Sequence, residues 1–159
     1  MWSIMRATEH SRGEGERNFS LRVAPRYCDT QGVVHASRYF EFFEDAFLSW
    51  LDHTCGSYLQ LQETGGDLVI VENSCSYRRP ARQNEVITID VDPLWVGRSS
   101  FCVAFHVRHG QLDLVEGRSV YVYVKKGTPT PIPALLDGAL AGAKAQPAGF
   151  RPPGRDPCL

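Results

Sequence analysis

Residues 26–44 read RYCDTQGVVHASRYFEFFE, and the rest of the chain is organised around this stretch. It leaves an alternating segment, passes through the turn-forming residues Asp29 to Gly32 and enters an aromatic-rich segment. Apolar residues then recur at the spacing of one helix face, at Tyr39, Phe43, Ala46, Phe47, Trp50 and Leu51. The pattern predicts a long helix that runs to about Cys55 and is capped by Gly56, with an acid beside its entrance.

The segments before and after this helix are typical of strands. Residues 19–27 alternate between apolar and polar side chains, and Pro25 places the end of that strand at a sheet edge or outside the ladder. After a short segment that ends at Gly65 and Gly66, four more strands are expected over residues 68–77, 85–96, 99–108 and 112–125. Their short, turn-rich separators suit antiparallel hairpins, and Gly117 predicts a β-bulge inside the last strand.

This order of elements predicts an α+β fold in which a five-stranded antiparallel sheet wraps around one long central helix. Such a sheet has open edges, and pairing two copies edge to edge would remove one edge from each. The 159 residues suit one domain, placed at residues 18–143 and ending in a short helix over 134–143. Residues 1–17 are expected to be a flexible leader, and the Pro- and Gly-rich residues 144–159 are expected to be disordered.

The composition argues against several classes of partner. The chain has 17 Lys and Arg against 18 Asp and Glu, so it offers no long-range attraction to nucleic acid or to an anionic membrane. It lacks a signal peptide and any run near the roughly 18 apolar residues of a membrane span, which predicts a cytoplasmic protein. The five cysteines show no metal-binding spacing, and the glycine motifs of nucleotide and dinucleotide sites and of serine hydrolases are missing. Neither a metal nor a cofactor is expected.

Asp29 is the first candidate for chemistry. An acid before a helix is commonly an N-cap, but Ala36 or Ser37 lies closer to the cap position of a helix that begins near Tyr39. If the helix instead begins directly after Gly32, the N–H groups of Gly32 to Val34 could hold a carbonyl oxygen as negative charge develops on it. Asp29 would then attack the carbonyl carbon or take a proton from water.

Other side chains have both a structural and a functional interpretation. His35 could orient water, polarise a carbonyl or hydrogen-bond to the backbone, and Glu44 could pair with an arginine or act as a base. His106 and His109 lack a third ligand for a metal. Two loops carry residues that either bind phosphate through guanidinium and hydroxyl groups or are simply solvated: Arg78, Arg79 and Arg82 on one, and Arg98, Ser99 and Ser100 on the other.

Residues 27–44 resemble the signature of the 4-hydroxybenzoyl-CoA thioesterase family and its YbgC-like relatives, which belong to the hotdog-fold superfamily. The matching pattern is Y-x-D-x-x-G-V-V-H-A-S-x-Y-x-x-F-F-E. The likeness continues through Asn73-x-x-x-Tyr77-x-x-Pro80-Ala81 and through residues 97–100, so it covers about residues 19–133.

The resemblance implies a hotdog domain that dimerises into a continuous sheet, with acyl-thioester sites between protomers. It assigns the catalytic carboxylate to Asp29, as nucleophile or general base, and the polarising N–H groups to Gly32, Val33 and Val34. His35 stands one residue earlier than the histidine of the YbgC-like branch. The family's phosphate contacts correspond to Arg98 and Ser99, and more distantly to Arg82.

The expected function is therefore hydrolysis of an acyl-CoA or acyl-carrier-protein thioester to a free acid, by a homodimer or a homotetramer. Tyr39 and Phe43 on the aromatic helix face would suit an aromatic or polyketide-type acyl group, or they belong to the core. One alternative is a hotdog dehydratase that acts on 3-hydroxyacyl chains through a histidine and an acid. Another is a non-catalytic module that binds acyl thioesters.

Overall fold

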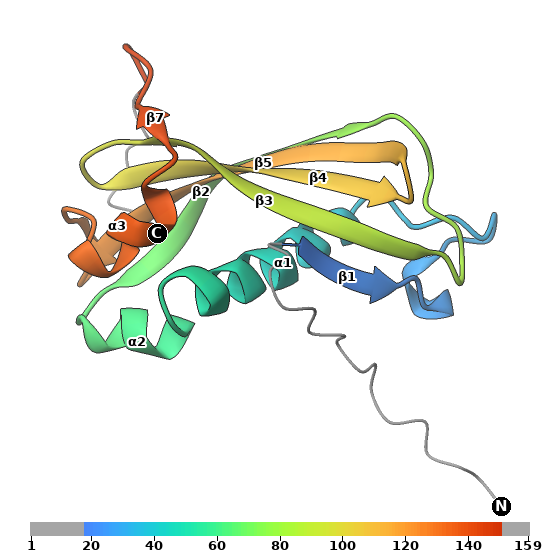
Figure 1. Cartoon of the computed structure of the whole chain (residues 1–159), viewed down its shortest axis with the longest axis horizontal. Coiled ribbons are helices and arrows are strands. Elements are labelled where there is room, and N and C mark those ends of the chain that lie inside the picture. The colour runs from blue at the N-terminus through green and yellow to red at the C-terminus, as the bar shows by residue number, and fades with distance from the viewer. Residues whose placement is uncertain (1–17, 151–159) are drawn as a thin grey trace, which may run out of the picture.

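The computed structural model describes residues 18–150. At its centre is helix α1 (Arg38–Thr54), which lies inside the curve of a bent sheet (Figure 1). The residues of the predicted stripe are all buried on this helix, together with Phe42. Gly56, just after the helix, has a φ of 97°, a conformation that favours glycine. The predicted helix is confirmed, and it begins at Arg38 rather than after Gly32.

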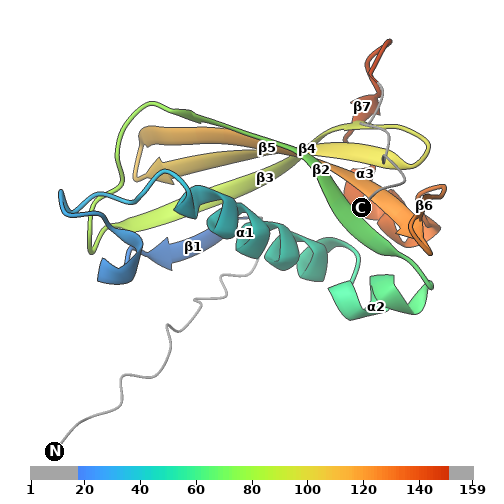
Figure 2. The same cartoon turned by 180° about the vertical axis from the view of Figure 1, so that it is seen from behind.

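The sheet has the order β1-β3-β4-β5-β2, and every neighbouring pair in this order is antiparallel. These strands are β1 (Asn18–Arg22), β2 (Asp67–Tyr77), β3 (Val86–Val96), β4 (Ser100–His109) and β5 (Leu112–Lys125). The two-residue strand β6 (Thr128–Pro129) pairs with β5, and β7 (Lys144–Ala145) pairs with β3. A sheet of five main strands around one helix is the predicted hotdog fold, with β1 and β2 at its edges (Figure 2).

Short helical elements complete the chain. The strand β1 ends earlier than predicted because Pro25 opens a 3-10 turn, η1 (Pro25–Tyr27). Helix α2 (Tyr58–Glu63) follows α1 and begins with a capping box between Ser57 and Gln60. The predicted C-terminal helix consists of the 3-10 turn η2 (Ala134–Leu136) and α3 (Asp137–Leu140), which contribute three side chains to the core: Leu136, Ala139 and Leu140. Within residues 18–150, no helix combines the length and apolar character needed to cross a bilayer.

Gly117 lies in a regular part of β5, so the predicted bulge at this position is wrong. It pairs in register with Cys75 on β2 and with Phe105 on β4. A Cβ atom at position 117 would lie 2.3 Å from the ring of Phe43. That ring stacks on Phe105 with centroids 4.5 Å apart, so the glycine makes room for an aromatic side chain of α1 rather than for a bend in the strand.

Residues 144–150 are ordered against the sheet, which corrects the prediction of a disordered tail from Lys144 onward. Gln146 donates its N–H to Val96 O at 3.1 Å, and the ring of Phe150 lies 4.7 Å from that of Trp95. Phe150 covers a small second apolar cluster around Trp95. The composition of this segment does not predict the contact, because Pro and Gly around Phe150 dominate it. The remainder of the predicted tail, residues 151–159, and the predicted leader, residues 1–17, lie outside the described residues.

Candidate functional site

Asp29 belongs to a tight hairpin formed by residues 28–34. The segment between β1 and α1 that contains this hairpin lies at the end of the sheet where α1 begins (Figure 1). Asp29 N–H donates to Val33 O at 2.9 Å, and His35 N–H donates to Tyr27 O at 2.9 Å. Gly32 closes the turn with a φ of 74° and donates to Asp29 O at 3.0 Å. The Gly-containing turn of the sequence is therefore the tip of a small β-ladder and not the first turn of the helix.

A third segment, residues 81–83, extends this ladder. Val34 N–H donates to Ala81 O at 2.9 Å, and Gln83 N–H donates to Gly32 O at 3.1 Å, which sets Val33 opposite Arg82. Because side chains alternate along extended segments, Asp29, Val33 and Arg82 share one face of the ladder. Their neighbours on the other face, including the buried Val34 and Ala81, contact the core. Arg82 and Asp29 thus lie on the same surface.

The two oxygens of the Asp29 carboxylate have different surroundings. Oδ1 accepts the Gln31 N–H at 2.8 Å and has a longer contact of 3.5 Å with the Val33 N–H. Oδ2 has no hydrogen-bond partner within residues 18–150, and the residue is exposed. The turn therefore orients the carboxylate through one oxygen and leaves the other available to attack a carbon or accept a proton.

The backbone N–H groups that are free to hold a carbonyl oxygen differ from those predicted from the sequence. Gly32 and Val34 use their N–H groups in backbone hydrogen bonds, and Val33 N–H faces the Asp29 carboxylate. Ala36 N–H, in contrast, has no partner among the described residues. His35 C=O accepts from Arg38 N–H at 2.9 Å, and in this trans peptide the Ala36 N–H points the opposite way, out of the start of α1. The Ala36 N–H is therefore a candidate donor that the sequence did not single out, although the cap position predicted for Ala36 or Ser37 points to the same place.

His35 caps the turn before α1. Its Nδ1 accepts the Ser37 N–H at 3.2 Å and lies 2.8 Å from Ser37 Oγ. Because Nδ1 accepts a backbone N–H, the neutral ring carries its proton on Nε2. No hydrogen bond joins His35 to Asp29 in the described part of the chain. The geometry thus gives this histidine a local backbone role.

The residues expected to line an acyl pocket belong to the core instead. Tyr39 and Phe43 are each 2% exposed. Phe43 is held between Gly117 and Phe105, and the Tyr39 hydroxyl accepts the Ala81 N–H at 3.4 Å. A helix wrapped on most sides buries its whole aromatic stripe, which periodicity cannot distinguish from a ligand-facing surface. Glu44, on the same helix, is exposed and forms no ion pair within residues 18–150.

The predicted phosphate-binding residues lie at opposite ends of the sheet. Arg82 lies on the same face of the ladder as Asp29. Arg98 and Ser99 belong to the β3–β4 turn, which lies at the opposite end of the sheet (Figure 1). Between them runs β3, whose 11 residues make ten steps of about 3.3 Å and so place its two ends ~33 Å apart. Ser99 C=O accepts from Tyr123 N–H at 2.8 Å, which ties this turn to the sheet. A single chain therefore does not bring Asp29 and Arg98 together.

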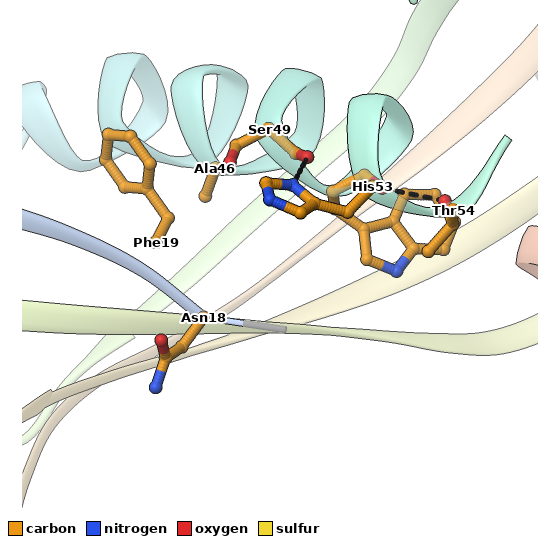
Figure 3. Close-up of a pocket in the computed structure, with 7 residues that line it drawn as sticks. Asn18, Phe19, Ala46, Ser49, His53 and Thr54 are labelled. Atoms are coloured by element: carbon orange, nitrogen blue, oxygen red, sulfur yellow. Dashed lines mark hydrogen bonds between the residues drawn. The ribbon is translucent and has the colours of Figure 1, made fainter. Parts of the chain in front are cut away.

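The two histidines considered as metal ligands do not form a metal site. His106 Nε2 lies 3.9 Å from Asp92, His109 Nδ1 is 2.9 Å from Val86 O, and the described residues contain no cluster of three metal-binding side chains. A small hollow lies between β1 and the second half of α1, where His53 Nδ1 is bonded to Ser49 O (Figure 3). It has room for about one water molecule and is lined by none of the predicted site residues.

Comparisons with known proteins identify the family of this chain and show which solved structures share its fold. The sequence profile of the Thioesterase superfamily matches residues 31–116, which is more than half of the chain. A putative esterase from Aquifex aeolicus is 26% identical over 115 residues, covering 72% of this chain and 90% of the relative. Similar crystal structures include a 1,4-dihydroxy-2-naphthoyl-CoA thioesterase from Synechocystis, with a TM-score of 0.72, 18% identity and coverage of 78% of this chain and 94% of that one. Another is a gentisyl-coenzyme A thioesterase, with a TM-score of 0.70, 20% identity and coverage of 78% and 98%.

Proposed function

Because the chain belongs to the thioesterase superfamily, we propose that it hydrolyses acyl-CoA thioesters with Asp29 as its catalytic carboxylate. The observation that carries this proposal is the turn around Asp29, which holds Oδ1 and leaves Oδ2 without a partner among the described residues. The Ala36 N–H, which points out of the start of α1, is the proposed donor to the thioester oxygen. If Asp29 acts as a general base, it takes a proton from a water that attacks the carbonyl carbon, and the CoA thiolate leaves as the free acid forms. If Asp29 attacks directly, the thiolate leaves as a mixed anhydride forms, and water then hydrolyses the anhydride to the free acid and restores the carboxylate.

An aromatic acyl group is the proposed substrate class. The two CoA thioesterases of similar fold act, by their names, on hydroxylated aromatic acyl groups. Aromatic side chains that stay partly open beside the core include Phe40, which is half-buried and contacts Phe43, and Tyr77, which is 50% exposed. These rings, and not those of Tyr39 and Phe43, would stack on such a group. A polyketide-type acyl group on a carrier protein has the same aromatic chemistry and the same phosphopantetheine arm, so both carriers belong in the assay.

We propose further that the working site is shared by two copies of the chain. β2 is an edge strand of 11 residues, and its apolar Ile70 is 45% exposed. Pairing β2 with β2 of a second copy, in antiparallel fashion, would satisfy its open backbone groups and set the Tyr77 end of one strand beside the Asp67 end of the other. Such a homodimer would bring the Arg98 end of one copy toward the Asp29 end of the other. Light scattering of the purified chain distinguishes monomer, dimer and tetramer.

An assay with a panel of acyl-CoA and acyl-carrier-protein thioesters tests the proposed function, and the quantity measured is the free thiol that hydrolysis releases. The panel contains aromatic, straight-chain and 3-hydroxyacyl groups. Release is expected with aromatic acyl-CoA substrates, and the absence of release from every thioester would overturn the proposal. Formation of an unsaturated acyl thioester from the 3-hydroxyacyl substrate would support the dehydratase alternative, and binding without any turnover would support the binding module.

Replacing Arg98 with Ala is expected to raise KM for an acyl-CoA about 10-fold and to leave kcat unchanged, because a guanidinium–phosphate contact persists from ground state to transition state. KM for the matching acyl-pantetheine, which has no phosphate, should stay the same. The control is Arg118→Ala, which removes an exposed arginine that pairs with Glu72 at 3.3 Å. Equal KM values for the wild type and Arg98→Ala would place the phosphate contact elsewhere.

A further inference from the structure

We propose that Tyr77 is a positioning residue for the Ala36 N–H, an inference that rests on the proposed function. Tyr77 is the last residue of β2, and its hydroxyl donates to the carbonyl oxygen of Ala36 at 2.9 Å. The two residues are 41 positions apart in the sequence. This bond links the edge strand of the sheet to the turn from which α1 begins.

The other hydrogen bonds of this turn are local. His35 N–H reaches Tyr27 O, His35 C=O accepts from Arg38 N–H, and Ser37 N–H reaches His35 Nδ1. Each of these bonds joins residues within the same stretch of chain, so together they shape the turn without attaching it to the sheet. The Tyr77 hydroxyl supplies that attachment, at the residue whose own N–H lacks a partner within residues 18–150.

The ring of Tyr77 is itself held in place. It packs edge-on against Tyr39, with ring centroids 5.6 Å apart and an interplanar angle of 65°. Tyr39 is buried, packs against Phe42 at 5.8 Å and accepts the Ala81 N–H. Ala81 in turn belongs to the ladder that carries Asp29. The buried rings of Tyr39 and Phe42 therefore support the ring of Tyr77, and the Tyr39 hydroxyl also contacts the ladder that carries Asp29.

The direction of the Ala36 N–H is sensitive to this support. An N–H that stabilises a developing oxyanion must point at the position that the oxygen occupies in the transition state, and small displacements cost rate. The N–H and the C=O of Ala36 belong to the two peptide planes that meet at its Cα, so a shift of the plane that carries the C=O alters the φ and ψ angles that set the direction of the N–H. By holding the carbonyl, the Tyr77 hydroxyl restricts these angles, so its loss should affect the chemical step more than substrate binding.

Kinetics of Tyr77→Phe in the full-length protein test the inference. The variant keeps the ring that packs on Tyr39 and loses the donated hydrogen bond. We expect kcat for an aromatic acyl-CoA to fall about 10-fold while KM stays within about twofold of the wild type, as expected for loss of a transition-state contact. The matched control is Tyr123→Phe, which removes a hydroxyl that lies 2.5 Å from Thr64 Oγ1 near the opposite end of the sheet. That variant should keep the wild-type kcat.

An activity-independent measurement accompanies the kinetics. The backbone amide resonances of Ala36 and Ser37 should shift in Tyr77→Phe and stay in place in Tyr123→Phe. Wild-type kcat in Tyr77→Phe, or equal losses of kcat in the two variants, would overturn the inference, as would unmoved Ala36 and Ser37 resonances. If the wild type hydrolyses no thioester, the proposed function fails, and the amide shifts alone then decide whether Tyr77 holds the turn.

Discussion

Asp29→Asn is expected to lower kcat by roughly 100- to 10,000-fold, the range typical for loss of a catalytic acid or base. The amide oxygen of Asn can still accept the Gln31 N–H, so the turn should keep its shape. What disappears is the negative charge of the carboxylate, because an NH2 group, which cannot act as a base or a nucleophile here, takes the place of Oδ2. KM for an aromatic acyl-CoA should change little, because the loss concerns the reacting centre. Steady-state kinetics with the preferred substrate of the panel measures both constants.

Asp52→Asn is the matched control. Asp52 is an exposed carboxylate on α1, so its replacement removes the same charge from the surface and should leave kcat unchanged. A kcat of Asp29→Asn within about threefold of the wild type would remove Asp29 from the mechanism. Unchanged binding of acyl-CoA by Asp29→Asn, with turnover lost, separates an enzyme from a module that only binds.

The two roles open to Asp29 differ in where a solvent oxygen first appears. A nucleophilic carboxylate forms an anhydride, and a single turnover in ¹⁸O-labelled water places the label in Asp29 when water attacks the aspartyl carbon. A general base delivers the labelled water to the acyl carbon and leaves Asp29 unlabelled. Mass spectrometry of the peptide that contains residue 29 reads the difference.

Gly117→Ala is expected to lower the free energy of unfolding by about 2 kcal/mol, the middle of the range for overpacking a core. Elsewhere in a strand, alanine is at least as stable as glycine. Here the added methyl group meets the Phe43 ring at 2.3 Å, and Phe43 cannot move away because it stacks on Phe105. Urea denaturation with an unchanged m-value measures the loss.

Gly142→Ala serves as the control for this substitution, since a Cβ atom at position 142 meets nothing within 4 Å. It should change the stability by less than about 0.5 kcal/mol. Phe43→Leu, which trims the opposing ring, should cost less in the Gly117→Ala background than in the wild type. Additive losses in the double variant would show that the methyl group and the ring do not interact.

The elements of the fold were accessible to sequence reasoning because each produces a local pattern. The stripe from Tyr39 to Leu51 has helical spacing, and the strand runs 85–96, 99–108 and 112–125 are separated by turns too short for anything but hairpins. Errors arose where a distant contact decided the outcome. Gly117 makes room for an aromatic ring of α1, and Phe150 is ordered because it covers Trp95.

The site was predictable in part for the same reason. An acid in a turn before a helix, and the motif that surrounds it, are features of consecutive residues, so Asp29 could be named. The candidate donor N–H could not, because which backbone groups already have partners depends on residues such as Ala81 and Tyr27 that the turn meets only after folding. Burial likewise decided that Tyr39 and Phe43 belong to the core.

The sequence by itself therefore determined that an acid lies in a glycine turn, that a long aromatic helix follows, and that strands flank this helix on both sides in the chain. Local hydrogen bonding and periodicity act between near neighbours, and the sequence displays them directly. The tertiary structure alone decided that the helix begins at Arg38, that the Ala36 N–H has no partner within residues 18–150, and that the Tyr77 hydroxyl donates to the Ala36 carbonyl. Those outcomes depend on which of several possible partners each group meets, and only the packing of the whole chain selects among them.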